Sequence, residues 1–281
     1  MDDSVSPGLE ARALAYATWL RRTHSPGHAR RTAERNAAFL LPHLRPGMDL
    51  LDGGCGPGSV SLGLAKYVAP GIVTGVDLSP EAVAAARLRA KEHGTEHARY
   101  QVADVTRLPF KDGTFDAVFM HAVLQHLKRP EAAIAEAYRV LRPGGIIAVA
   151  DADFGGSVIW PASGEVAASI DLIERLRSLD GGDPRIGRRL ASLLADEGCS
   201  GVTATATAVV DGTREAAGRT AAFWSSYLAA PELRDYVLAL GWTGPEQLKA
   251  MSVAWNAWGE APGAFWARYW CEAIGRRPLG P

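Results

Sequence analysis

The stretch LLDGGCGPGSVSLGLA, residues 50–65, decides the fold expected of this chain. It joins an apolar run that ends at Asp52 to a segment of helical spacing that begins near Ser59. The link is rich in glycine, which costs backbone entropy. A bare strand-to-helix turn exposes backbone N–H groups to the polar part of a nucleotide-like ligand. An empty tight turn is the competing interpretation, and a lone glycine motif does not exclude it.

Strand-like and helix-like segments alternate on both sides of this turn. Strands are expected at residues 48–52, 72–77, 98–104, 115–121 and 145–153, and helices at 59–68, 80–93 and 130–141. Ser79 is expected to cap the helix that starts at Pro80. Such alternation is typical of a parallel sheet covered by helices on both faces.

The flanking segments extend this pattern. We expect helices at 9–22, 28–41, 163–179 and 186–197, a strand at 202–210, helical structure at 213–258 and a last aromatic strand at 264–277. The first two helices are separated by THSPGH, where Pro26 and Gly27 punctuate the chain. The expected architecture is α/β: a Rossmann-like, doubly wound, seven-stranded sheet. We place an N-terminal helical lid at 1–45, the core at 46–211, a helical insertion or substrate cap at 212–262, and the final strand and tail at 263–281.

Composition excludes several classes of function. The 281 residues include 30 basic and 31 acidic side chains, and a net charge of −1 gives no electrostatic reason to bind nucleic acid. No apolar run approaches the roughly 20 residues that span a bilayer. The opening MDDSVSPGLE lacks a secretion signal, so we predict a cytoplasmic protein. Three widely separated cysteines without a CxxC pair predict neither disulfides nor a metal site.

Four acidic residues lie at or near the ends of expected strands. Asp52, Asp77 and Asp104 end successive expected strands, and in an open parallel sheet these residues and the loop before Asp151 would converge on one crevice. Asp77 lies 25 residues after Asp52, near the spacing of a ribose-binding acid. A dinucleotide fingerprint would need glycine at position 59, where serine stands, so a nicotinamide cofactor is disfavoured.

DGGCGPGS, followed by VTGVDLSPEAV, VADVTRLPF, FDAVFMHAVLQHL and LRPGG, resembles the class I S-adenosylmethionine-dependent methyltransferases. Within them it is similar to the small-molecule branch of ubiquinone and menaquinone C-methyltransferases. The resemblance covers about residues 28–210. It implies S-adenosyl-L-methionine as the cofactor.

The resemblance also implies roles for the glycine turn. Gly54, Gly56 and Gly58 would let the loop approach the methionine part of the cofactor, with Cys55 in the same loop. Asp52 would orient the loop and the cofactor's amino group. We interpret Cys55 as a small residue tolerated in a tight turn, because methyl transfer needs no covalent enzyme intermediate.

Further roles follow at the next strand ends. Asp77 would accept from both ribose hydroxyls, and Leu78 would lie against the adenine. Asp104 would accept from the adenine amino group, while the N–H of Val105 would donate to the ring. His121 would sit beside the methionine and the reacting methyl group.

Two residues before the turn complete the expected cofactor site. Tyr16, with Trp19, is expected to close over the cofactor, where an aromatic face favours the sulfonium charge. Arg31 is expected to meet the cofactor's carboxylate, although it is equally compatible with a solvated position.

The expected activity is in-line methyl transfer to O, N or C of a small, partly apolar metabolite, with orientation as the main catalytic factor. His121 is the first candidate for a base, and a histidine that only hydrogen-bonds the cofactor or a neighbouring helix is an equal alternative. The other candidates are His126, which we interpret as structural, Asp151 and Asp153. Two other functions stay open, a cofactor-binding regulatory protein and a cyclase. No pattern indicates the acceptor or the oligomeric state.

Overall fold

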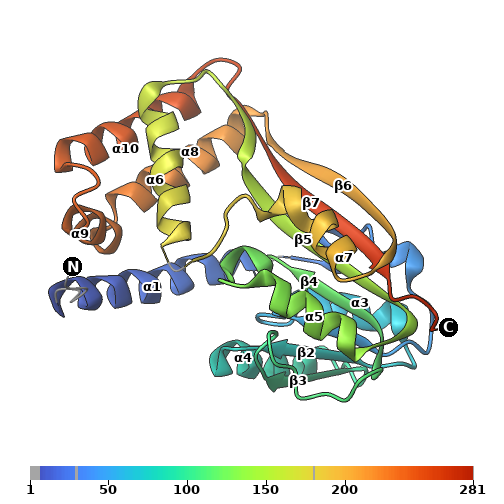
Figure 1. Cartoon of the computed structure of the whole chain (residues 1–281). Coiled ribbons are helices and arrows are strands. Elements are labelled where there is room, and N and C mark those ends of the chain that lie inside the picture. The colour runs from blue at the N-terminus through green and yellow to red at the C-terminus, as the bar shows by residue number, and fades with distance from the viewer. Residues whose placement is uncertain (1–6, 29–30, 180, 281) are drawn as a thin grey trace. The chain divides into compact units, whose positions relative to one another are not determined.

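The computed structural model describes the backbone of residues 7–28, 31–179 and 181–280, and their side chains except those of residues 7, 18 and 20–28. Seven strands form one sheet in the order β3-β2-β1-β4-β5-β7-β6 (Figure 1). The strands are β1 Leu50–Gly53, β2 Val73–Asp77, β3 Ala98–Val102, β4 Phe115–His121, β5 Leu141–Trp160, β6 Ser200–Asp211 and β7 Phe265–Arg276. This order confirms the predicted doubly wound α/β sheet.

The helices occupy the segments between and around these strands. They are α1 Pro7–His28, α2 Ala33–Asn36, α3 Ser59–Val68, α4 Pro80–Glu92, α5 Pro130–Val140, α6 Gly164–Ser178, α7 Leu190–Asp196, α8 Arg214–Ala229, α9 Pro231–Ala239 and α10 Pro245–Glu260. Single 3-10 turns are η1 Leu41–His43, η2 Leu124–His126 and η3 Ile186–Arg189. Among the helices described, none is both long and apolar enough to cross a membrane.

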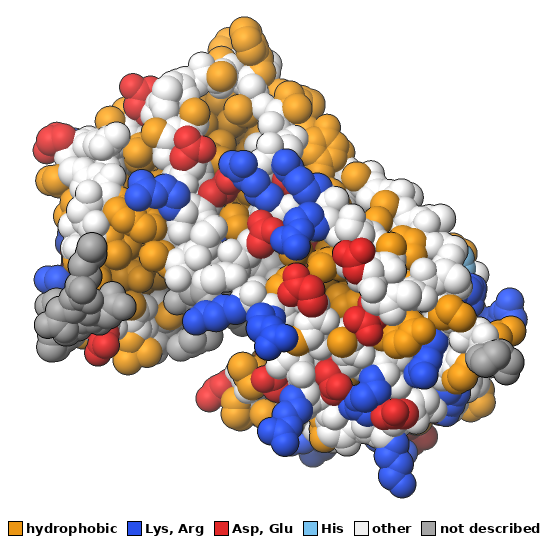
Figure 2. Space-filling view, viewed as in Figure 1, with side chains coloured by type: hydrophobic (Ala, Val, Ile, Leu, Met, Phe, Trp, Pro, Cys, Tyr) orange, Lys and Arg blue, Asp and Glu red, His pale blue; other side chains and the backbone are white. Residues whose placement is uncertain are grey.

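The chain divides into two compact units. The sheet unit comprises residues 26–155, 180–207 and 269–281, and the helical unit comprises 1–25, 156–179 and 208–268. On the face drawn in Figure 2, acidic and basic side chains are interspersed, in keeping with the balanced charge of the sequence.

In the sheet unit both faces of the sheet are covered. β1 runs parallel to β2 and β4. Its consecutive residues Leu50 and Leu51 are both buried and belong to different apolar clusters, one shared with α3 and the other with α5 and α7. Side chains alternate across a strand, so burial of both neighbours requires helices on both sides. The helix predicted after Ser79 is capped as expected, since the Ser79 hydroxyl oxygen accepts from the Ala82 N–H at 3.1 Å.

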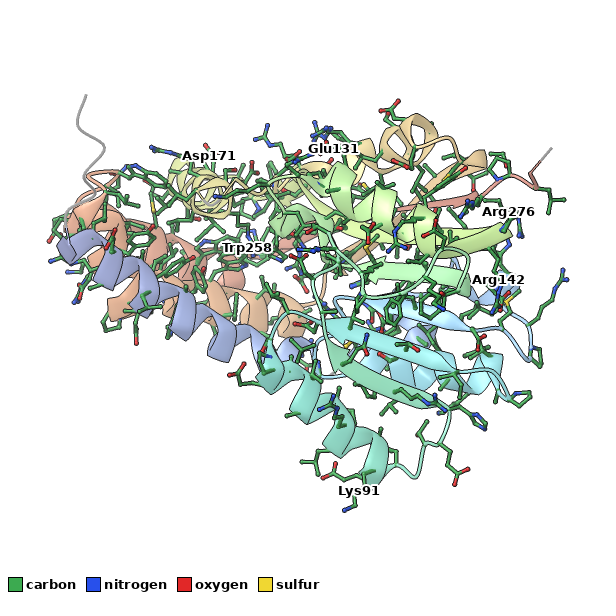
Figure 3. The ribbon with its side chains drawn as sticks, turned by 60° about the horizontal axis from the view of Figure 1, so that its bottom comes forward. Lys91, Glu131, Arg142, Asp171, Trp258 and Arg276 are labelled. Carbon is green, nitrogen blue, oxygen red and sulfur yellow. The ribbon has the colours of Figure 1, made fainter. Side chains whose placement is uncertain are left out.

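Ion pairs close the edge of the sheet where β1 and β4 begin. Arg142, labelled in Figure 3, contacts Asp116 at 2.5 Å and Asp49 at 3.2 Å. These ion pairs occupy the amino ends of the strands. In open α/β sheets ligands usually bind at the opposite, carboxyl ends.

The helical unit has its own aromatic core. Trp255, Trp258 and Trp266 are buried, and the Trp255 indole donates to the Ser169 hydroxyl at 2.8 Å. Helices α8 and α10 pack closely at Gly259, where an added Cβ would lie 2.4 Å from the Ala221 methyl group. Figure 3 shows Trp258 among these helices.

Two expected segments differ from the sequence prediction. The first helix was expected to end before THSPGH, but α1 continues to His28, so Pro26 and Gly27 fall in its last turn. Proline has no backbone N–H, so this turn lacks one hydrogen bond to the residue four positions earlier. The helix expected over 28–41 is reduced to α2 and the turn η1 among the residues described.

Candidate active site

The glycine turn has a backbone that only glycine adopts easily. Gly54 and Gly58 have φ values of +73° and +74°, in the left-handed region. A Cβ on Gly54 would lie 2.4 Å from Val123 Cγ2, and one on Gly58 would lie 2.9 Å from the Tyr100 hydroxyl. The turn is therefore bare both because of its backbone shape and because neighbouring side chains press against it.

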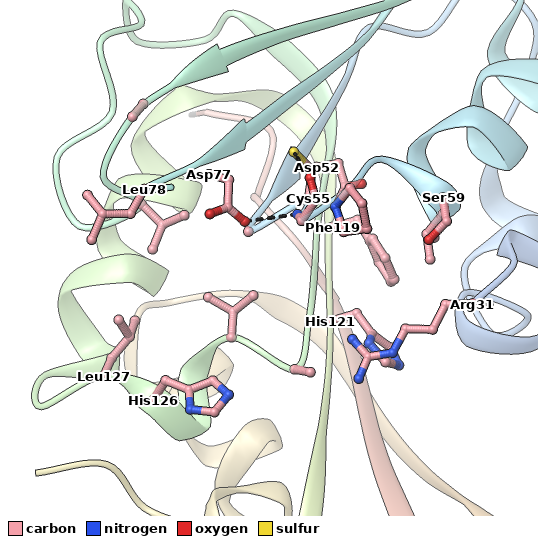
Figure 4. A pocket seen from close by; sticks show the side chains of 18 of the residues that line it. Arg31, Asp52, Cys55, Ser59, Asp77, Leu78, Phe119, His121, His126 and Leu127 are labelled. Atoms are coloured by element: carbon pink, nitrogen blue, oxygen red, sulfur yellow. Dashed lines mark hydrogen bonds between the residues drawn. The ribbon is translucent and has the colours of Figure 1, made fainter. Parts of the chain in front are cut away.

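Asp77 connects the end of β2 to this turn. Its Oδ2 accepts from the Gly56 N–H at 2.9 Å (Figure 4). Its Oδ1 accepts from the Ser79 N–H at 2.9 Å. Each carboxylate oxygen has a second lone pair, so Asp77 retains capacity to accept from a ligand. The same residue thus shapes the loop and faces the pocket beside it.

Asp52 and Cys55 lie deeper in the turn. Asp52 is buried, and its Oδ2 accepts from the Ser61 hydroxyl at 2.5 Å. Burial raises the pKa of Asp52 to about 7, because the charged form loses solvation. Burial, with the nearby charges of Asp52 and Asp77, raises the pKa of the Cys55 thiol far above its ordinary value. A thiol held protonated is a poor nucleophile, which supports the structural interpretation of Cys55.

Asp104 follows β3 in a tight local turn. Its Oδ1 accepts from the N–H and the hydroxyl of Thr106, at 2.8 and 2.7 Å. The carboxylate is exposed, while the next side chain, Val105, is buried. The pair therefore offers one polar and one apolar group at the same strand end.

These residues surround one pocket of about 370 Å³ at the carboxyl ends of β1, β2 and β4. Figure 4 shows Asp77 and Leu78 on one side of it, Arg31 and His121 on another, and His126 with Leu127 on a third. The predicted cofactor residues in its lining are Arg31, Asp52, Gly54, Cys55, Gly56, Asp77, Leu78, Asp104, Val105 and His121.

Two predicted cofactor residues do not belong to this lining. Gly58 is the N-cap residue of α3, next to the lining residue Ser59. Tyr16 belongs to the helical unit, where it is 8% exposed and its hydroxyl lies 2.7 Å from that of Tyr227. The structure thus places Tyr16 in the apolar core of the helical unit.

His121, at the end of β4, contacts side chains from β7 and α2. Its ring stacks on Trp270 of β7, with centroids 4.4 Å apart and planes 22° from parallel. Its Nε2 lies 3.2 Å from Asn36 Nδ2. Neither Asn36 nor Trp270 was identified from the sequence as a site residue.

Arg31 is a cation in the lining of the pocket. Burial lowers the pKa of Arg31 from its ordinary value, and the negative charge of Asp151 opposes that shift. Its guanidinium carbon lies 5.6 Å from the Trp270 ring centroid. No carboxylate among the residues described forms an ion pair with it, so the pocket presents a positive charge to a ligand.

The candidate bases differ in whether they line the pocket. Asp151 lies inside β5, not at its end, and its Oδ2 accepts from the Leu124 N–H at 3.0 Å. Asp153 forms two hydrogen bonds with Arg188, at 2.6 and 2.7 Å. Neither lines the pocket, whereas His121 and His126 both do. His126, interpreted from the sequence as structural, ends η2 and lines the pocket.

Comparisons with known proteins agree with this geometry. A family model described as a methyltransferase domain matches residues 51–149. An uncharacterised methyltransferase of Schizosaccharomyces pombe is 33% identical over 189 residues, which are 65% of this chain and 68% of that protein. A ubiquinone/menaquinone biosynthesis C-methyltransferase of a Ruegeria species is 38% identical over 112 residues, 40% of this chain and 44% of that protein. The solved structure of the YcgJ protein from Bacillus subtilis has a TM-score of 0.60 at 17% identity, and the match covers 88% of this chain and all of that one.

Proposed function

The chain belongs to the class I S-adenosylmethionine-dependent methyltransferases, and we propose that it moves a methyl group from that cofactor to a small, partly apolar acceptor. The observation that carries the proposal is the pocket at the carboxyl ends of β1, β2 and β4. It combines a bare backbone turn, acidic groups at successive strand ends and one cation without an ion-pair partner among the residues described. These are the groups that an amino acid joined to a nucleoside requires.

The residues of the pocket fit this cofactor from one end to the other. We assign the ribose hydroxyls to Asp77 and the adenine amino group to Asp104, with Leu78 and Val105 against the ring. Arg31 would hold the carboxylate of the methionine part, since a partly desolvated guanidinium is stabilised by an anion. A side chain at Gly54 would meet Val123, so glycine is required there. The backbone of the turn is therefore left bare beside the proposed cofactor.

The sulfonium of the cofactor supplies the activated methyl group, so the protein's task is to orient the acceptor and exclude water. We propose in-line displacement at the end of the pocket where His121 lies. For a hydroxyl or an acidic carbon as acceptor, the candidate bases in the pocket lining are His121 and His126.

The acceptor is proposed to be small and partly apolar. Phe119, Val123 and Leu127 contribute apolar side chains to the lining of the pocket, and we propose that they lie against the apolar part of the acceptor. The N-terminal lid over residues 1–45 and the cap over 212–262 stay sequence predictions.

Asp77→Ala tests the cofactor assignment. We expect it to weaken binding of S-adenosylhomocysteine by about 3 kcal/mol, roughly 100-fold, because both ribose hydroxyls lose a charged acceptor. Isothermal titration calorimetry measures the change, with Asp77→Asn as the variant that keeps the acceptor geometry at Oδ1. Glu92→Gln, an exposed position at the end of α4, is the control. Unchanged affinity in Asp77→Ala would sink the assignment.

Transfer itself is tested with cofactor carrying a labelled methyl group and an extract of the source organism. We expect the label in a small, organic-soluble product. Tight cofactor binding in the absence of any labelled product would contradict methyl transfer and favour a binding protein.

A further inference from the structure

Asn36 connects the chain before the glycine turn to the pocket histidine. It is the last residue of α2, and its Nδ2 lies 3.2 Å from His121 Nε2, on the side of the imidazole opposite the backbone attachment. His121 itself is 8% exposed and lines the pocket. The sequence separation of the two residues is large, so this contact exists only in the fold.

The orientation of the Asn36 amide is fixed by a second hydrogen bond. The Thr32 N–H donates to Asn36 Oδ1 at 3.1 Å. Turning the amide over would place its NH₂ group against the Thr32 N–H, two donors facing each other. The Asn36 Nδ2 is therefore the donor toward His121, and Nε2 must be the acceptor.

An imidazole that accepts at Nε2 carries its proton on Nδ1 and is neutral, because imidazolium has a donor at both nitrogens. We propose that Asn36 is a positioning residue that holds His121 in this neutral form, so that the methionine end of the pocket admits a cationic ligand. The inference rests on the proposed function, in which that ligand is a sulfonium.

A neutral histidine matters because the pocket already contains one positive charge. Arg31 lies over the same Trp270 ring on which His121 stacks. The carboxylate proposed to bind Arg31 balances that charge. A charged His121 would add a second cation close to the sulfonium and repel it.

The charged groups around His121 have opposite effects on whether its imidazole binds a second proton. His126 and Asp52 line the same pocket as His121, and Asp151 follows Ala150, the β5 residue that pairs with His121. Burial raises the pKa of Asp52 and of Asp151 to about 7. Their negative forms favour a proton on the imidazole, whereas Arg31 opposes it. β7 contributes the uncharged Trp270. The hydrogen bond from Asn36 acts on the ring directly and is lost when Nε2 takes up a proton.

The first measurement is the nitrogen NMR spectrum of protein labelled with ¹⁵N-histidine, with His121→Gln used to identify the signal. In the wild type we expect an unprotonated Nε2 across the range from about pH 8 to pH 5.5. In Asn36→Asp, which keeps the acceptor for Thr32 but places an oxygen at Nε2, we expect Nε2 to be protonated. Asn36→Leu should let His121 titrate near the ordinary histidine range.

The second measurement compares S-adenosylmethionine with S-adenosylhomocysteine, which lacks the positive charge, by calorimetry at pH 8 and pH 5.5. In the wild type the ratio of their affinities should stay constant. In Asn36→Leu the charged ligand alone should bind roughly tenfold more weakly at pH 5.5.

The results of these two measurements distinguish a failure of this inference from a failure of the proposed function. A protonated Nε2 in the wild type, or an Asn36→Leu titration identical to the wild type, would overturn the role of Asn36 whether or not a ligand binds. Failure of both ligands to bind the wild type would instead contradict the proposed function, and the NMR result would stand by itself. Should Asn36→Leu not fold, Asn36→Asp still gives the decisive spectrum.

Discussion

At the scale of single residues, Gly54 is the position where backbone shape and packing coincide. Gly54→Ala places a Cβ in a left-handed conformation and 2.4 Å from Val123 Cγ2. We expect a loss of about 3 kcal/mol in the free energy of unfolding and weaker cofactor binding, because the loop must shift. Urea unfolding and calorimetry measure the two effects.

Two companion variants make this prediction specific. Gly56 also has a positive φ, +53°, but a Cβ there would meet nothing within 4 Å. Gly56→Ala should therefore lose only about 1 kcal/mol through backbone strain. Adding Val123→Ala to Gly54→Ala should recover part of the stability. Equal losses in the Gly54 and Gly56 variants would show that packing against Val123 is unimportant.

Asp151 predicts a pH dependence of stability. Its pKa is raised to about 7 by burial, whereas an unfolded aspartate has a pKa of about 3.9. Between these values the folded state binds more protons, so the free energy of unfolding falls as pH rises, by at most about 1.4 kcal/mol per pH unit. The stabilisation is complete below about pH 4 and lost above about pH 7.

Asp151→Asn removes this titration and keeps an acceptor for the Leu124 N–H. We expect urea unfolding of the variant to depend less steeply on pH than that of the wild type between pH 4 and pH 7. Asp52 titrates in the same range and contributes equally to both proteins, so the difference in slope isolates Asp151. Parallel stability curves would contradict the assigned direction.

At the scale of elements, the sequence predicts the ends of a helix or strand correctly where short-range signals mark those ends. α3 and β4 occupy the predicted ranges 59–68 and 115–121, because glycine punctuation and apolar runs mark their ends. β5 extends beyond its predicted end at residue 153, to Trp160, and passes through Gly155 and Gly156. Pairing within a sheet can continue a strand through glycines that propensity alone would exclude.

In the candidate site, too, some residues were predictable from the sequence and others were not. The loop glycines and the acids at strand ends were predictable, because parallel topology brings strand ends together whatever their separation in sequence. Asn36 and Trp270 were not, since each reaches His121 from a distant segment and carries no motif of its own. Nor do the contacts of Tyr16 follow from a motif: within the helical unit it packs with Tyr227 and Tyr236, and its proposed role at the cofactor stays a prediction.

At the scale of the whole molecule, the two units contain different kinds of residues. Of the eight tryptophans, only Trp270 falls within the sheet unit, and the other seven fall within the ranges of the helical unit. The polar groups proposed to hold the cofactor all belong to the sheet unit. Stability of the aromatic core and affinity for the cofactor should therefore respond to different substitutions.

Trp255→Phe tests this division. Trp255 is fully buried in the helical unit and donates a hydrogen bond to Ser169, so the substitution removes both volume and a buried donor. We expect a loss of about 1 to 2 kcal/mol in the free energy of unfolding, measured by urea denaturation. Calorimetry should give an S-adenosylhomocysteine affinity equal to that of the wild type, because every group assigned to the cofactor is left in place. A matched loss of affinity, comparable to that of Asp77→Ala, would show that the aromatic core contributes to the cofactor site and that the proposed division is wrong.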